Sequence, residues 1–136
     1  YRQFKPTLVL AHAPEDYHPD HRAASALAEA ASWFCASHGQ KTGSPALALS
    51  PALWWMDTLN MSSFIPGFYV DISQHLQLKE RMLACHRSQL QRGADSDFSP
   101  MTELVRLQAQ ARGSQAGVTA AEAFRAHHAF KRARAW

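Results

Sequence analysis

The chain has 136 residues, of which 46% are hydrophobic and 18% charged, a composition that indicates one globular domain and excludes wholesale disorder. No run approaches the roughly 18 apolar residues of a membrane-spanning helix, and we expect no signal peptide, because the first residues lack its charged start and apolar middle. The cysteines, Cys35 and Cys85, have no metal or redox spacing, which excludes a disulfide scaffold and favours two reduced thiols in a cytoplasmic protein.

The charge is unevenly distributed along the chain. Fourteen lysines and arginines against eleven aspartates and glutamates give a formal net charge of +3. Residues 101–136 carry +4 of this and the remainder −1. A basic segment can attract nucleic acid or a membrane surface, but this one has a single cluster of three cationic side chains and no nucleic-acid-binding motif. We interpret it as a solvated C-terminal face and expect no nucleic-acid partner.

The first forty residues have the pattern of a strand, a polar loop and a helix. Residues 7–11 form a continuous apolar run, which is typical of a strand buried on both faces. Apolar residues then recur at helical spacing between Leu27 and Phe34. Pro19 suits the first helical position and Gly39 suits a left-handed cap, so we predict that the helix begins near Pro19 and ends at Gly39.

The rest of the chain predicts two more strands and three more helices. The strands cover 52–56 and 68–72, and the helices run from Ser73 to 92–93, from 99–100 to Gly113, and from Thr119 onward. The last helix depends on the capping-box spacing of Thr119 and Glu122. Because strands alternate with helices, the class is α/β with a mainly parallel sheet.

The chemistry is concentrated in residues 15–21, where two histidines and three acids follow the first strand. Open α/β sheets bind their ligands at this end of the strands. His18 and His21 share a face if the turn is helical, and Asp20 can accept an N–H bond or orient an imidazole. Either both rings bind one metal, or one binds it while the other transfers a proton. The plain alternative is that both histidines merely cap the helix.

The number of ligands indicates a partial site. A catalytic zinc usually takes three protein ligands. His12 is near in sequence, but the other histidines lie on predicted helices or in the tail, and no second element supplies a pair of ligands. We therefore expect this chain to contribute part of a metal site.

Residues 16–24 resemble the H-P-D-H motif of the PIG-L/LmbE-like deacetylases, zinc-dependent hydrolases that remove acetyl groups from N-acetylglucosaminyl and related compounds. The resemblance continues in family order through nearly the whole chain, over residues 54–58, 69–73, 79 with 86–89, and 112–117 with 121–124. It implies a Rossmann-like LmbE-type domain, a Zn²⁺ cofactor and an N-acetylated amino sugar or glycoconjugate as substrate.

The resemblance also implies roles for three residues. His21 corresponds to the metal-binding histidine of the motif. His18 corresponds to the catalytic histidine, which stabilises the tetrahedral oxyanion or donates a proton to the leaving amine. Asp20 corresponds to the acid beside them, which supports the ligands.

Other motif residues have plainer interpretations. For His86, Ser88 and Gln89 we favour packing of a helix against the core, and Trp54 and Trp55 are more typical of a sheet core than of a sugar-stacking platform.

The segment around Glu122 is left open. The capping box predicts a helix from Ala123 to Phe130, whereas the resemblance implies an extended segment from Ala121 to Phe124.

One departure from the family pattern bears on activity. The family begins with a strand and an H-P-D-D motif, which supplies two more metal ligands and the aspartate that acts as general base. This sequence has no Asp-Asp dipeptide, and His-Pro occurs only at His18-Pro19. We therefore interpret residues 1–136 as one partial deacetylase domain whose N-terminal strands are missing and which is inactive alone. The alternative is a degenerate domain that binds a sugar or a partner without chemistry.

Overall fold

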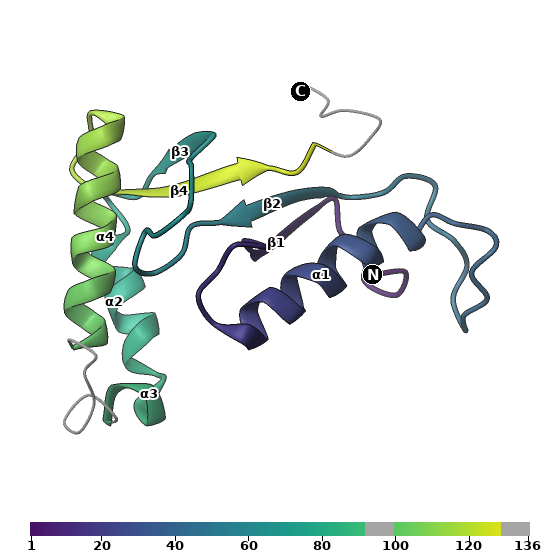
Figure 1. The fold of residues 1–136 in the computed structure, drawn as a ribbon, viewed down its shortest axis with the longest axis horizontal. Helices are drawn as coiled ribbons and strands as arrows, with labels where there is room; N and C mark the ends of the chain where they lie inside the picture. Colours follow the sequence, from purple (N-terminus) through teal and green to yellow (C-terminus); the bar gives the residue numbers. More distant parts are fainter. Residues whose placement is uncertain (92–99, 129–136) are drawn as a thin grey trace. The chain divides into compact units, whose positions relative to one another are not determined.

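The computed structural model describes residues 1–91 and 100–128 (Figure 1). Its elements are, in order, β1 (Leu8–His12), α1 (Pro19–Phe34), β2 (Ala52–Met56), β3 (Phe68–Asp71), α2 (Leu76–Ala84), α3 (Arg87–Gln91), α4 (Met101–Ala116) and β4 (Ala121–Ala126). This order confirms the predicted α/β class. The chain divides into two compact units, the first made of Tyr1–Thr58, Ser63–Gly67 and the chain from Phe124, and the second of Leu59–Ser62 and Phe68–Ala123. The single-domain interpretation of residues 1–136 stays a prediction.

The four strands follow the hydrogen-bond order β1-β2-β4-β3. β1 and β2 pair in parallel, so that Leu8 faces Ala52 and His12 faces Met56, whereas β4 pairs antiparallel with β2. The sheet is therefore mixed, whereas the sequence predicts a mainly parallel one. Parallel pairing puts the C-terminal ends of β1 and β2 at one edge, and His12 stands at that edge. Trp55 is buried in the sheet core, as predicted, and Trp54 is half-buried. The prediction that the first strand is buried on both faces was wrong, since Leu8 and Leu10 of β1 are exposed.

Helix α1 begins at Pro19 as predicted but ends at Phe34, five residues before Gly39. The predicted end was wrong because a residue distant in sequence takes up the helix's last carbonyls. The Arg2 guanidinium donates to the carbonyl oxygens of Phe34, Cys35 and Ser37 and reaches the following loop as well. Carbonyls at a helix C-terminus have no partner within the helix, and the buried arginine supplies one.

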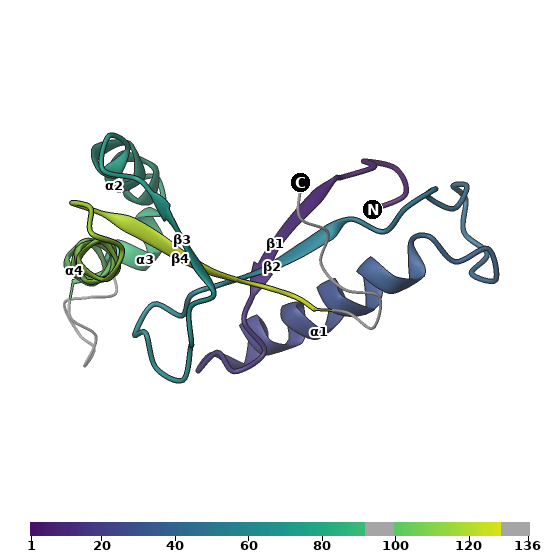
Figure 2. The ribbon, with the colours of Figure 1, turned by 90° about the horizontal axis from the view of Figure 1, so that it is seen from above.

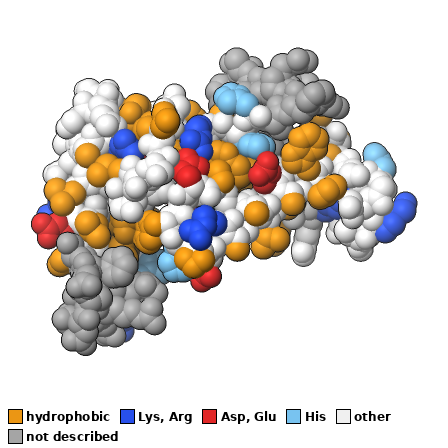
Figure 3. All heavy atoms as spheres, in the orientation of Figure 1, with side chains coloured by type: hydrophobic (Ala, Val, Ile, Leu, Met, Phe, Trp, Pro, Cys, Tyr) orange, Lys and Arg blue, Asp and Glu red, His pale blue; other side chains and the backbone are white. Residues whose placement is uncertain are grey.

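The buried residues of α1 are not those of the apolar stripe that the sequence shows. Figures 1 and 2 both show α1 alongside β1 and β2. Ser25 and Ser32 are its buried residues, whereas Leu27 and Phe34 are 71% and 52% exposed. The buried side chains of α1 are small, and small side chains let a helix approach a sheet closely. The larger apolar side chains of α1 are exposed to solvent. Hydrophobic side chains accordingly appear at many points of the face drawn in Figure 3.

The predicted helix from Ser73 is two shorter helices, α2 and α3. The backbone N–H of Cys85 donates to Met82, and that of His86 to Leu83, so a tight turn separates them. Ser73 does not cap α2, since its hydroxyl donates to Asp71 and accepts from the N–H of Ala120.

Two smaller predictions concern the α2–α3 region. His86 and Ser88 are exposed, so the prediction that they pack against the core was wrong. The side chain of Gln89 and the predicted helix end at 92–93 lie outside the described residues.

Helix α4 runs through Gly113 and ends at Ala116, with Gly117 in the left-handed conformation (φ 72°). Gly113 was predicted to end the helix because glycine often does. Here it serves another purpose: a Cβ at Gly113 would lie 2.8 Å from the Cα and N atoms of Ala120. Ala120 is fully buried and belongs to the second unit's core with Ile72 and Ala109. Glycine at 113 thus permits the close approach of α4 to that core.

The segment around Glu122 is extended, as the resemblance implied, so the capping-box prediction of a helix was wrong. Ala121 and Ala123 are buried and Glu122 between them is not, which is the alternation of a strand. The Glu122 carboxylate accepts a hydrogen bond from Lys79 Nζ at 2.7 Å. The predicted helical residues after 128 lie outside the described part of the chain.

Both cysteines are free thiols, Cys35 buried and Cys85 exposed, as expected. No helix in the described ranges combines the length and hydropathy needed to cross a bilayer.

Candidate metal and catalytic site

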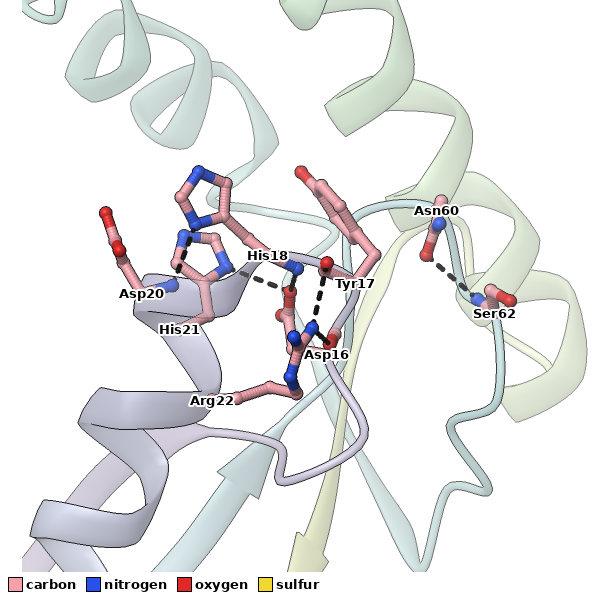
Figure 4. A network of polar contacts seen from close by, with 8 residues as sticks. All are labelled: Asp16, Tyr17, His18, Asp20, His21, Arg22, Asn60 and Ser62. Carbon is pink, nitrogen blue, oxygen red and sulfur yellow. Dashed lines mark hydrogen bonds and ion pairs between the residues drawn. The ribbon is translucent and has the colours of Figure 1, made fainter.

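The candidate site occupies the first unit, from the last residue of β1 to the first turn of α1 (Figure 4). The loop between them turns tightly, because the Asp16 N–H donates to the carbonyl of Ala13. Arg22 of α1 reaches back and donates to the carbonyls of Asp16 and Tyr17. The helix therefore holds the loop that precedes it, and the polar side chains of residues 16–21 come together.

His21 is oriented by a buried carboxylate. Its Nδ1 lies 3.0 Å from Oδ1 of Asp16, which is 4% exposed, while the His21 side chain is 34% exposed. The same oxygen accepts the backbone N–H of His18 at 2.8 Å. A carboxylate is an acceptor, so Nδ1 of His21 carries the proton and Nε2 keeps a free lone pair. This carboxylate–imidazole pair is the arrangement that orients histidine ligands of metals in proteins.

His18 caps α1 and still leaves one ring nitrogen available. Its Nδ1 accepts the backbone N–H of Asp20 at 3.1 Å, as expected of an N-cap residue. In the neutral ring the proton then resides on Nε2, which makes that nitrogen a donor. Capping and chemistry, offered by the sequence as alternatives, thus use different nitrogens of one ring.

Asp20 lies at the site through its backbone. Its carboxylate makes no hydrogen bond or ion pair with any described residue, and Figure 4 shows it pointing away from the His21–Asp16 pair. The carboxylate that orients His21 belongs to Asp16. The sequence analysis chose Asp20 as the supporting acid and gave Asp16 no role, because the burial of Asp16 is not visible in the sequence.

Three imidazoles and a phenol ring lie against one another at the site. The rings of His12 and His21 stack with centroids 3.9 Å apart, and those of His18 and His21 lie 4.7 Å apart. Tyr17 presents its ring at an angle to both His18 and His21. Burial, and then the neighbouring His21, lowers the pKa of His12. Burial, and then the Asp16 carboxylate, raises the pKa of Tyr17.

His12, Asp16 and His21 are side chains of the types that bind metal ions, and they lie close together. Each offers one possible ligand atom, and these atoms lie within 4.8 Å of one another. Imidazole nitrogen and carboxylate oxygen are the ligand types of catalytic zinc sites, so zinc suits the kinds of donor gathered here. Sequence reasoning selected His21 and not the other two members. The signal it passed over was the place of His12 as the last residue of the first strand.

A second acid of the loop is held from β4. Glu15 Oε1 lies 2.6 Å from an Arg125 nitrogen, and the Arg125 guanidinium lies over the ring of Phe64, 5.1 Å from its centroid. Both β4 and the first turn of α1 therefore fix the loop that carries Asp16.

No family model matches the chain. Solved structures do match, and three of them share the fold over most of this chain. The 4-carboxy-2-hydroxymuconate hydratase of Pseudomonas putida is 22% identical, with a TM-score of 0.76 over 99% of this chain and 57% of its own. A conserved protein of Thermus thermophilus is 28% identical, with a TM-score of 0.76 over 90% and 52%. The N,N'-diacetylchitobiose deacetylase of Pyrococcus horikoshii, solved with an inhibitor, is 24% identical, with a TM-score of 0.74 over 93% and 47%.

The resemblance to LmbE-like deacetylases is thus confirmed in the fold, which is that of a deacetylase and of related proteins. The chain spans about half the length of these structures.

Proposed function

We propose that this chain is the part of a metal-dependent hydrolase that contains the H-P-D-H motif, and that the complete enzyme removes an acetyl group from an N-acetylated amino sugar or its conjugate. One observation carries the proposal. His21 has its Nδ1 committed to Asp16, while the adjacent His18 has its Nδ1 committed to the Asp20 N–H. Two neighbouring rings therefore offer opposite properties at Nε2, an acceptor lone pair on His21 and a donor on His18.

His21 would hold a zinc ion through Nε2, with Asp16 behind it. A bound zinc polarises the acetyl carbonyl and lowers the pKa of its water toward ~7. Catalytic zinc takes three protein ligands, so further ligands complete this site in the whole enzyme. Asp16 keeps the His21 ring in its ligating tautomer and strengthens it as a ligand.

His18 stabilises the developing oxyanion. As water adds to the amide carbon, the carbonyl oxygen gains negative charge, and Nε2–H of His18 donates to it. The cap bond favours this role over proton donation to the leaving amine, because full protonation would place a proton on Nδ1 against the Asp20 N–H. Removing one such donor costs on the order of 10²–10³ in rate.

A general base must take the proton from the attacking water, and no motif of this sequence supplies such a base. The family resemblance assigns that role to an aspartate of the H-P-D-D motif, which is absent from residues 1–136. We therefore propose that this chain alone is inactive. The substrate class rests on the deacetylase among the solved structures. The two unpaired thiols favour a reducing compartment, the cytoplasm.

The test is acetate release by the complete protein from N-acetylglucosamine and N,N'-diacetylchitobiose, with added Zn²⁺ and with a chelator. The proposal predicts release with Zn²⁺, loss with the chelator, and a decrease on the order of 10²–10³ in His18→Ala. Sugar binding without acetate release would instead identify a degenerate binding domain.

The hydratase among the solved structures favours a second candidate, addition of water to an unsaturated hydroxy acid. Such a reaction also needs a group that polarises an oxygen of the substrate and a water that is activated for attack. The same residues therefore suit it. The probe is 4-carboxy-2-hydroxymuconate, the compound in the hydratase's name. A decrease in the absorbance of its carbon–carbon double bonds, without acetate release from the acetylated sugars, would select hydration over deacetylation.

A further inference from the structure

His12 is held rigidly beside His21. It is the last residue of β1, where parallel pairing places it opposite Met56. Its half-buried ring stacks on that of His21, with centroids 3.9 Å apart and planes 7° from parallel. The sheet pairing of β1 thus fixes the backbone of His12, and the ring of His12 lies face to face with that of His21.

This stacking is incompatible with a shared ion. The lone pair of an imidazole nitrogen lies in the plane of its ring, and zinc binds along it at about 2.0–2.1 Å. Two nearly parallel planes do not meet near the rings, so an ion in the plane of His21 lies well out of the plane of His12. An ion midway between the planes would lie above both rings, where neither offers a lone pair. His12 and His21 therefore cannot both ligate one ion in this arrangement.

We propose that His12 is a positioning residue, which fixes the plane of the His21 ring by stacking while Asp16 fixes its rotation by hydrogen bonding. Two contacts of different kinds then aim Nε2 of His21. Asp16 acts at the ring edge and His12 at the ring face. This inference deepens the proposed function, since it rests on His21 as the metal ligand.

Substitution of His12 separates stacking from ligation. Phenylalanine can stack but offers no ligand atom, glutamine offers a ligand oxygen but no ring, and alanine offers neither. The measurement is the affinity of the complete protein for Zn²⁺ by competition with a chromophoric chelator, which needs no substrate. We expect His12→Phe to stay within about threefold of the unaltered protein, and His12→Ala and His12→Gln to lose about 10- to 100-fold, as when an orienting partner of a ligand is removed.

Three results would overturn the inference. The first is zinc binding by His12→Phe as weak as that by His12→Ala. The second is binding by all three variants like that of the unaltered protein, and the third is tighter binding by His12→Gln than by His12→Phe. Thermal unfolding of each variant without metal shows whether it folds, and His12→Phe and His12→Gln still decide the question if His12→Ala does not. Zinc binding without acetate release would overturn the proposed function alone, whereas no zinc binding by the unaltered protein would overturn both.

Discussion

Oδ1 of Asp16 accepts the Nδ1–H of His21 at 3.0 Å and the backbone N–H of His18 at 2.8 Å. One buried oxygen therefore sets the tautomer of one histidine and the backbone position of the other. Since Asp16 is 4% exposed, these bonds form away from bulk water, where charge-assisted hydrogen bonds are stronger.

The Asp16–His21 bond predicts unequal effects of two conservative substitutions. Asp16→Asn removes the charge behind His21 and should weaken Zn²⁺ binding by the complete protein about 10- to 100-fold. Asp20→Asn is the matched control, because its carboxylate has no bond with the described residues and its backbone N–H is kept. Isothermal titration with Zn²⁺ measures both. A larger loss for Asp20→Asn would show that Asp20 is the orienting acid.

Gly113→Ala should destabilise the protein although it lies inside a helix. Helix propensity alone predicts a gain of about 1 kcal/mol for glycine to alanine. The new Cβ, however, would lie 2.8 Å from backbone atoms of Ala120, which cannot move aside as a flexible side chain can. We expect a net loss of about 1–3 kcal/mol in the free energy of unfolding.

Gly43→Ala is the control for this substitution, because nothing lies within 4 Å of its Cβ position. It should change the stability by less than about 0.5 kcal/mol. Urea unfolding of the two variants tests the pair. A Gly113→Ala variant as stable as the unaltered protein would contradict the close approach of α4 to Ala120.

Two buried serines of α1 should respond oppositely to alanine. Ser25 Oγ has no hydrogen-bond partner among the described residues, whereas Ser32 Oγ donates to the carbonyl of Glu29 at 2.7 Å. Burying an unpaired hydroxyl is unfavourable, so Ser25→Ala should leave stability unchanged or raise it by about 1 kcal/mol. Ser32→Ala should lose about 0.5–1.5 kcal/mol. Thermal unfolding compares them, and a greater loss for Ser25→Ala would indicate a partner for its hydroxyl.

Local sequence patterns predicted the features that local forces decide. The apolar runs at 7–11 and 52–56 are strands β1 and β2, and Pro19 begins α1. The end of α1 depended on a distant residue instead, because Arg2 takes up its last carbonyls. In α4 the sequence offered two glycines as the helix end. Gly113 lies inside the helix, where Ala120 approaches it closely, and Gly117 ends the helix in the left-handed conformation.

In the candidate site, too, local spacing predicted some features and not others. The spacing of His18 and His21 follows from one helical turn, so the sequence alone indicated that they lie together. The role of Asp16 depends on its burial in a loop, and that of His12 on where β1 ends, and neither follows from spacing. The resemblance to a family implied an extended segment from Ala121 to Phe124, where the local capping pattern predicted a helix, and the structure places strand β4 there.

The roles of the two histidines are tested together by measuring bound zinc and acetate release in His18→Ala and His21→Ala of the complete protein. We expect His18→Ala to keep its zinc and to lose turnover by a factor on the order of 10²–10³, and His21→Ala to lose both the zinc and the activity. Equal loss of zinc from both variants would contradict the division of roles between the two rings.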